Sequence, residues 1–307
     1  MKAALVLHTD RVDRGAEFVS ADGIAASARA AETAGFDAVA VTDHPFPEDA
    51  WMRSGGHHAL DPFVALSFAA SATTHVRLLT YILVLPYRNP FLTAKAVASL
   101  DVLSGGRLIL GTAVGYLAAE FRALGVDFAE RNALADEAIR AMKAAWTQSG
   151  VHFEGKHFTA DGHTALPRPA QQPHPPIWVG GNSRNAMRRA VTHGDGWMPI
   201  YNPTPDLARR RHTAVIASEA DLAARVAEVK AMAADAGRTT PFDVSFTVLG
   251  LRAYGTPDFD RAGFLAHVAK LRAAGVTYLT VNLPATTRAE HVDRIARFGD
   301  DLMPHLA

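Results

Sequence analysis

The feature that most constrains the fold is a regular alternation of two kinds of segment along the whole chain. Short runs of aliphatic and β-branched residues predict eight strands, at Ala3–His8, Asp37–Thr42, Val76–Leu85, Arg107–Ala113, Ile177–Gly180, Trp197–Ile200, Asp243–Leu249 and Val276–Val281. Helical spacing of apolar residues predicts helices at Gly23–Ala34, Asp61–Thr73, Pro90–Leu103, Arg131–Trp146, Ser183–His193, Glu219–Ala236, Ala262–Ala274 and Ala289–His305. Such alternation is typical of βα units on a parallel sheet.

Eight strands, each followed by a helix, within 307 residues favour an α/β fold of the (β/α)₈ TIM-barrel type. A doubly wound open sheet is the structural alternative. Gly35, Gly237 and Gly275 follow predicted helix ends, where a left-handed cap favours glycine. No linker divides the chain, so we expect one TIM-barrel domain over residues 1–307.

Two stretches are longer than an ordinary connection. Residues 45–60 carry Trp51 and His57, and residues 151–176 are rich in His, Gly and Pro and include a predicted hairpin at Val151–Phe158. We expect both insertions at or near the carboxyl end of the strands, where barrel enzymes build their sites.

Composition excludes several classes of protein. The 31 Lys and Arg residues balance 31 Asp and Glu residues, which argues against nucleic acid as the main partner. The chain has no cysteine, which removes disulfides, thiolate metal sites and cysteine nucleophiles. No apolar run approaches the roughly 18–20 residues that cross a membrane. The first residues read as a strand and not as a signal peptide, so we expect a cytoplasmic, soluble protein.

The first candidate site follows the second predicted strand, in Thr42-Asp43-His44-Pro45. Side chains at the carboxyl end of a barrel strand point into the mouth, where this fold keeps catalysis. A histidine titrates near neutral pH and can donate or accept a proton. The structural alternative is that Asp43 and His44 only shape the turn before the proline.

Two further passages have the properties of a ligand-binding wall. The third predicted strand is long, and a bulge within it would turn the backbone towards a ligand. Gly111 and Gly115, four residues apart after the fourth strand, let the backbone approach a flat ligand closely. Their spacing is not the dinucleotide pattern, so NAD binding is not predicted. A buried strand and its turn explain the same residues without a ligand.

The passage Gly180-Gly181-Asn182-Ser183 joins the fifth strand to a helix and predicts an anion site. Free N–H groups at a helix start favour a phosphate, and glycines let its oxygens approach. An ordinary turn with a good helix cap is the alternative. The loops after the seventh and eighth strands, which often hold phosphate in barrels, lack a comparable glycine pair.

The 14 histidines keep a metal-dependent hydrolase open as a minor alternative. No His-Glu-x-x-His helix, Gly-x-Ser-x-Gly elbow or phosphate-binding Walker loop is present in the sequence. The run Arg209–Arg211 has the pattern of a solvated face, and no other feature of the sequence requires it to bind an anion.

Taken together, these residues resemble the luciferase-like monooxygenase superfamily and, within it, the oxidoreductases that depend on the deazaflavin coenzyme F420. The resemblance runs from Met1 to about Trp197. It rests on the stretches Leu85–Pro90, Ala94-Lys95, Leu100–Arg107, Gly111, Gly115, Glu120-Phe121, Leu124-Gly125, Phe128, Arg131, Pro175–Gly181 and Gly194–Trp197.

The resemblance implies a bacterial luciferase-type barrel with a tricyclic ring in its mouth. The ring would rest against a bulge in the third strand, with a non-proline cis peptide at Ile82–Leu83. The cofactor-binding residues that it implies are Thr80, Tyr81, Ile82, Leu83, Gly111, Thr112 and Gly115 around the ring and Gly180, Gly181, Asn182 and Ser183 at the phosphate. Cations for a glutamate tail would come from Arg184, Arg188 and Arg189.

The function implied by the resemblance is hydride transfer between C5 of coenzyme F420 and an unidentified small organic substrate. His44 would move the accompanying proton, with Asp43 as its acidic partner. An FMN-dependent luciferase-like monooxygenase is the first alternative, because both cofactors carry a ribityl phosphate. A barrel that binds a ligand without catalysis is another, because a fold does not dictate its function. The resemblance also implies a homodimer. In this reading residues 45–60 and 151–176 are lids that choose the substrate.

Overall fold

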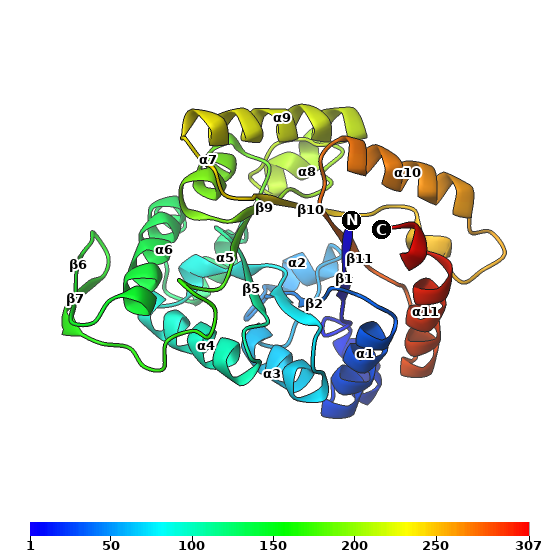
Figure 1. Cartoon of the computed structure of the whole chain (residues 1–307), viewed down its shortest axis with the longest axis horizontal. Helices are drawn as coiled ribbons and strands as arrows, with labels where there is room; N and C mark the ends of the chain where they lie inside the picture. Colours follow the sequence, from blue (N-terminus) through cyan, green and yellow to red (C-terminus); the bar gives the residue numbers. More distant parts are fainter. Residues whose placement is uncertain (307) are drawn as a thin grey trace.

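The computed structural model describes residues 1–306 and contains a closed ring of eight parallel strands. The ring consists of β1 (Lys2–Val6), β2 (Ala38–Val41), β3 (Arg77–Thr80), β5 (Leu108–Ala113), β8 (Ile177–Gly180), β9 (Gly196–Met198), β10 (Asp243–Thr247) and β11 (Tyr278–Val281). Pairing of β3 with β5 closes it, through Leu78 opposite Leu108 and Leu79 opposite Ile109. The predicted (β/α)₈ TIM barrel is therefore confirmed (Figure 1).

The helices follow the strands as predicted and form the outer layer. They are α1 (Ala21–Thr33), α3 (Pro62–Ala72), α4 (Pro90–Leu103), α6 (Arg131–Thr147), α7 (Arg184–His193), α9 (Glu219–Asp235), α10 (Arg261–Ala273) and α11 (Arg288–Asp301). Side chains of Asp61, Asn89 and Ser183 accept backbone N–H groups at helix starts, which explains where those helices begin. Within the described residues, no helix combines the length and apolar character that crossing a membrane requires.

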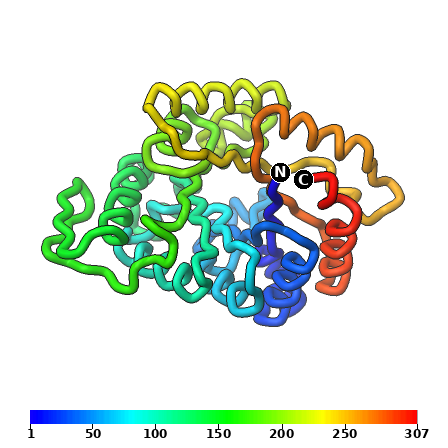
Figure 2. Tube along the Cα trace, in the orientation of Figure 1, coloured from blue at the N-terminus to red at the C-terminus, as the bar shows by residue number. Residues whose placement is uncertain are grey.

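The barrel interior is packed and forms the floor of the mouth. Strand residues alternate between the two faces, so that Ala4 belongs to the interior cluster while its neighbours Ala3 and Leu5 pack against the helices. Small alanines on β1 and β2 leave room for Trp178 and Tyr278, whose ring centroids lie 4.9 Å apart. Figure 2 shows the two ends of the chain side by side, and the amino group of Met1 donates to a carbonyl of the last turn.

Several short elements were not predicted, and three of them are α-helices of five or six residues. They are α2 (Asp49–Arg53), α5 (Ala118–Ala123) and α8 (Pro205–Arg210), together with the 3₁₀ turns η1 (Val12–Glu17), η2 (Leu85–Tyr87), η3 (Leu251–Ala253) and η4 (Met303–His305). Helices of five or six residues carry too little periodicity to be read from a sequence. All three bring residues to the site described below: Trp51 lies on α2, Glu120 on α5 and Arg209 on α8.

The third predicted strand is not continuous. It divides into β3 and the two-residue β4 (Leu83–Val84), which pairs with the end of β5. The interruption at residues 81 and 82 agrees with the expected irregularity in this strand. The cis peptide joins Tyr81 to Ile82, so the expected position at Ile82–Leu83 is wrong by one residue.

The second insertion forms the predicted hairpin, built from β6 (Val151–Glu154) and β7 (Thr159–His163). It follows a helix and precedes a strand, so it belongs to the amino-terminal end of the barrel and not to the mouth. Figure 1 shows it beyond α6, away from the ring of strands. The expectation that residues 151–176 form a lid over the site is therefore wrong.

Candidate functional site

A pocket of about 450 Å³ lies at the carboxyl ends of the strands, where the sequence placed the candidate residues. Its walls come from the segments that follow β2, β3, β5, β8, β9 and β10. The structure brings together eight of the predicted residues along its wall: Asp43, His44, Tyr81, Ile82, Gly115, Gly180, Gly181 and Ser183. The pocket has the size and mixed lining of a cofactor or substrate site.

His44 is held by a buried carboxylate that sequence reasoning missed. Its Nδ1 lies 3.4 Å from Oε2 of Glu120, which is fully buried on α5. Glu120 lies 76 residues further along the chain, so no local pattern connects the two. The only signal in the sequence was the place of Glu120-Phe121 among the stretches that carry the resemblance.

Three donors surround the Glu120 carboxylate. The backbone N–H of Phe46 donates to Oε1 over 2.9 Å, and the Tyr87 hydroxyl donates to Oε2 over 2.8 Å. Burial by itself raises the pKa of Glu120, but the hydrogen bonds from His44, Phe46 and Tyr87 outweigh it and hold that pKa below its usual value. Burial, followed by the neighbouring Glu120, raises the pKa of Tyr87. Glu120 therefore stays a carboxylate beside His44 at neutral pH.

Asp43 is hydrogen-bonded to residues other than His44. Its Oδ2 accepts from the Val84 N–H over 2.9 Å and from Arg88 Nη1 over 2.7 Å, and its Oδ1 accepts from Arg88 Nη2 over 3.0 Å. Both oxygens therefore tie the end of β2 to the segment after β4. The carboxylate bonded to His44 is Glu120, and the catalytic function expected of Asp43 stays a prediction.

The first insertion supplies an aromatic wall around His44. The ring of Trp51 lies 4.6 Å from the His44 ring and that of His57 lies 4.8 Å from it, with Tyr116 at 6.2 Å. Burial is the largest cause that lowers the pKa of His57, and the neighbouring His44 and His58 lower it further. Residues 45–60 therefore lie at the mouth, as expected of this insertion.

The residues predicted to surround a ring divide into two groups. Tyr81, Ile82 and Gly115 line the pocket, whereas Thr80, Leu83, Gly111 and Thr112 do not. The hydroxyl of Thr80 donates to the Gly111 carbonyl over 2.7 Å, and that of Thr112 donates to the Leu83 carbonyl over 3.1 Å. These four residues join β3, β4 and β5 behind the wall and shape the pocket indirectly.

The glycine pair after β8 is required by close packing. A Cβ on Gly180 would lie 2.4 Å from Cδ1 of Ile82, and Gly181 has a left-handed φ of 110°. The Gly181 N–H donates to the Met198 carbonyl over 3.2 Å, and the Asn182 N–H donates to the Thr213 hydroxyl over 2.7 Å. Both amides therefore have acceptors within the protein, and a phosphate at Gly180–Ser183 stays a prediction.

Two of the three cations expected near the phosphate, Arg184 and Arg189, are engaged elsewhere. Arg189 lines the pocket but is buried and paired with Asp136, and Arg184 lies 3.7 Å from Glu228. Among residues 1–306 there is no group of three or more His, Asp and Glu side chains that could hold a metal ion. The structure therefore offers no ligand set for the metal-dependent hydrolase alternative.

Comparison with known proteins places this arrangement in a family. An uncharacterized protein of Mycobacterium tuberculosis is 30% identical over 243 residues, which cover 73% of this chain and 78% of the relative. An FMNH2-dependent dimethylsulfone monooxygenase of Pseudomonas putida is 36% identical over 135 residues, which cover 43% of this chain and 37% of that protein.

Solved structures share the fold along the whole chain. The monooxygenase RslO1 from Streptomyces bottropensis has a TM-score of 0.76 at 22% identity and covers 100% of both chains. An F420-dependent secondary alcohol dehydrogenase, solved with an F420–acetone adduct, has a TM-score of 0.75 at 17% identity and covers 100% of this chain and 99% of its own. Residues 1–262 match the luciferase-like monooxygenase family, whose members are oxidoreductases. The protein therefore belongs to the luciferase-like monooxygenase family and is an oxidoreductase.

Proposed function

We propose that this oxidoreductase uses coenzyme F420 to transfer a hydride to or from a small organic substrate, with His44 as the group that moves the proton. The observation that carries the proposal is the buried pair of His44 and Glu120 at the wall of the pocket. A histidine oriented by a carboxylate is suited to exchange a proton at an adjacent reacting atom.

The lining of the pocket suits a flat cofactor with a charged tether. Ile82, Val84, Ala113 and Val114 offer an apolar wall on one part of the pocket. Polar groups also line the pocket, among them His44 and Ser183. When bound, the deazaflavin supplies the hydride chemistry at its C5.

The side chains around His44 fix which of its nitrogens exchanges the proton. Because a carboxylate only accepts hydrogen bonds, Nδ1 of neutral His44 carries its hydrogen and donates it to Glu120. Nε2 is then the basic atom that takes a proton from an alcohol or, once protonated, returns it to a carbonyl oxygen. Glu120 stabilises the protonated imidazole by its negative charge.

The aromatic side chains of the first insertion limit the access of water to this nitrogen. Trp51 and His57 pack against the imidazole ring from outside the barrel strands. Their rings restrict the orientation of His44. A site that excludes water favours hydride transfer over side reactions.

An FMN-dependent monooxygenase is the second candidate function. Its support is the Pseudomonas putida relative, whose described activity depends on FMNH2. FMN and F420 share the ribityl phosphate, so the same pocket is compatible with either. The difference in reaction is large, because the monooxygenase reaction consumes dioxygen and the F420 reaction does not.

Equilibrium binding of the two cofactors to the purified protein separates these functions. We expect coenzyme F420 to bind at least about tenfold more tightly than FMN, measured by fluorescence titration of each. A His44→Asn variant is the matched control and should bind F420 as the wild type does, because His44 acts on the substrate. Tighter binding of FMN would overturn the choice of cofactor, and failure of both to bind would overturn the proposed function.

The homodimer stays a prediction of the family resemblance. Val64 and Phe68 on α3 and Leu92 and Leu103 on α4 are exposed apolar side chains on neighbouring helices. This face is where we expect a second copy to pack.

A further inference from the structure

Arg211 differs from the other arginine that lines the pocket. Arg189 is buried and paired with Asp136, with its Nη2 also on the Asn132 side chain. Arg211 instead donates from its Nη1 to the Tyr201 carbonyl over 3.4 Å. Among residues 1–306, no carboxylate forms an ion pair with it. The pocket therefore contains a half-buried cation that is available to an anion.

The segment that carries Arg211 is fastened over the end of β8. Asn182 is fully buried, and its side chain donates to the carbonyls of Ile200 and Ala214 over 2.9 Å each. The Thr213 hydroxyl accepts the Asn182 N–H, so both ends of the segment are bound to one residue. This bonding explains why Asn182 stands behind the wall although the sequence suggested a direct contact with a ligand.

His212 lies just beyond the end of α8 and has a left-handed φ of 47°. This conformation is uncommon for a residue other than glycine. The N–H groups of His212 and Thr213 donate back into α8, to the carbonyls of Arg209 and Ala208. The chain therefore turns at His212 and places Arg211, His212 and Thr213 along the pocket wall. The three-arginine run is thus not uniformly a solvated face, because its last member faces the site.

At this end the pocket continues into an open surface groove of about 560 Å³. Ser183, His212 and Thr213 line both cavities, whereas Arg209 lines the groove and not the pocket. Arg209 and Arg210 are both exposed and paired with Asp206, but Arg210 lines neither cavity. A chain leaving the pocket here passes Arg211 first and Arg209 afterwards.

We propose that Arg211 binds the phosphate of the cofactor and that the groove beyond it binds a chain of carboxylates attached to that phosphate. The inference rests on the proposed function and deepens it, because F420 continues into a glutamate tail whereas FMN ends at its phosphate. A guanidinium is suited to phosphate oxygens because its N–H groups form a planar fork. Arg209 supplies a second cation at the position where the tail leaves the pocket.

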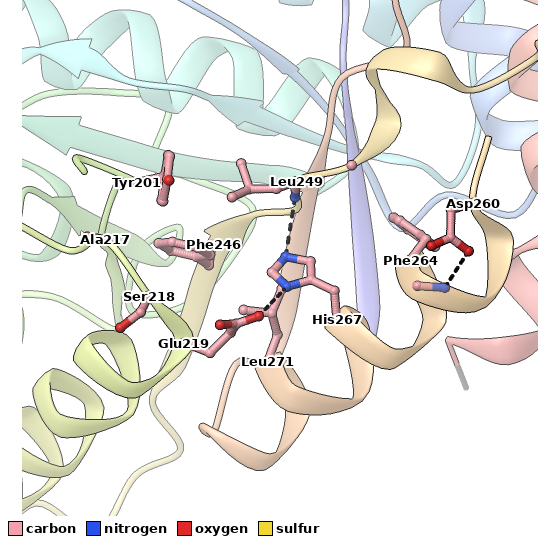
Figure 3. Close-up of a pocket in the computed structure, with 12 residues that line it drawn as sticks. Tyr201, Ala217, Ser218, Glu219, Phe246, Leu249, Asp260, Phe264, His267 and Leu271 are labelled. Carbon is pink, nitrogen blue, oxygen red and sulfur yellow. Dashed lines mark hydrogen bonds and ion pairs between the residues drawn. The ribbon is translucent and has the colours of Figure 1, made fainter. Parts of the chain in front are cut away.

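A second cavity beside the pocket has the opposite character. It measures about 300 Å³ and shares Tyr201 and Leu249 with the pocket. Figure 3 shows Glu219 and Asp260 on its walls, with His267 bonded both to Glu219 and to the Leu249 N–H. Two carboxylates oppose a chain of glutamates, so the groove past Arg209 is the better exit.

Binding of paired ligands tests the inference. An Arg211→Gln variant should weaken the binding of FMN and of F420 by about tenfold or more, because a charge-assisted hydrogen bond is lost. It should leave riboflavin, which has no phosphate, unchanged. An Arg209→Gln variant should weaken F420 but not FMN. Arg210→Gln is the matched control, since it removes the same charge from the same helix and faces neither cavity.

The outcomes separate failure of this inference from failure of the proposed function. If Arg211→Gln weakens riboflavin as much as FMN, or changes neither, the inference is wrong even though the cofactor binds. If the wild type binds neither tricyclic cofactor, inorganic tripolyphosphate serves as the probe of the anion site. Its binding, with loss in Arg211→Gln but not in Arg210→Gln, supports the anion site, and equal binding to all variants or to none overturns it.

Discussion

Two buried histidine sites of this barrel have opposite surroundings. His44 follows β2, is 9% exposed, and has the Glu120 carboxylate on one side and the pocket on the other. His8 follows β1, is 6% exposed, and stacks on the fully buried His291 with ring centroids 4.1 Å apart. Neither ring of this pair lines the pocket that His44 faces.

The two sites also differ in the groups that set the charge of their histidines. Burial is the largest cause that lowers the pKa of His8, and it lowers the pKa of His291 to about 3. Ser27 is the side-chain partner of His291 Nδ1, at 3.2 Å, and Nε2 of His291 has none among the described residues. Burial is thus the main cause that keeps these core histidines neutral, whereas the proton transfer proposed for His44 needs a carboxylate and an adjacent cavity as well. We therefore expect replacement of His44 to lower activity and replacement of His291 to change stability and its dependence on pH.

Replacement of His44 should produce the largest effect on activity. In His44→Asn, we expect turnover to fall by about 100- to 10,000-fold, because the group that moves the proton is lost. The assay is cofactor oxidation or reduction with a substrate found by screening alcohols and carbonyl compounds. A His291→Phe variant is the control and should keep wild-type turnover. Equal losses in both variants would mean that His44 acts through the fold alone.

Glu120→Gln tests the carboxylate and should have a smaller effect. Glutamine can still accept hydrogen bonds from His44 and Tyr87, but it has no charge to stabilise the protonated imidazole. We expect kcat to fall by about 10- to 100-fold while the affinity for the cofactor is unchanged. Tyr87→Phe removes one donor to Glu120 and leaves the charge, so its kcat should fall less. A loss of cofactor affinity in Glu120→Gln would show that the residue only supports the shape of the pocket.

The pair of His8 and His291 should affect stability and its dependence on pH. With a pKa of about 3 in the folded protein against 6.5 in the unfolded chain, His291 binds its proton only after unfolding. Its contribution is therefore present above about pH 6.5 and is lost as the pH falls, by about 2 kcal/mol between pH 7 and pH 5.

Urea unfolding of the wild type and of His291→Phe at these two pH values measures that loss. Phenylalanine keeps an aromatic ring against His8 but takes up no proton, so the free energy of unfolding should depend less on pH in the variant. His75→Gln serves here as the control, because it removes an exposed histidine. The same pH dependence in wild type and His291→Phe would contradict the assignment.

Features that depend on a single strand, helix or loop were predictable from the sequence. The period of the strands and helices specifies the barrel, because each βα unit buries its apolar face in only one way. His44 was found because a polar residue directly after a buried strand must lie at the mouth. The length of residues 45–60 likewise pointed to a loop that reaches the site.

Only the tertiary structure decided which side chains meet. The partner of His44 is Glu120 and not its neighbour Asp43, because a short helix after β5 brings that carboxylate across the mouth. Arg211 reaches the pocket for a similar reason, since Asn182 fastens its segment to the end of β8. Periodicity records the face on which a residue lies, whereas contacts between distant segments depend on loop paths that local sequence does not encode.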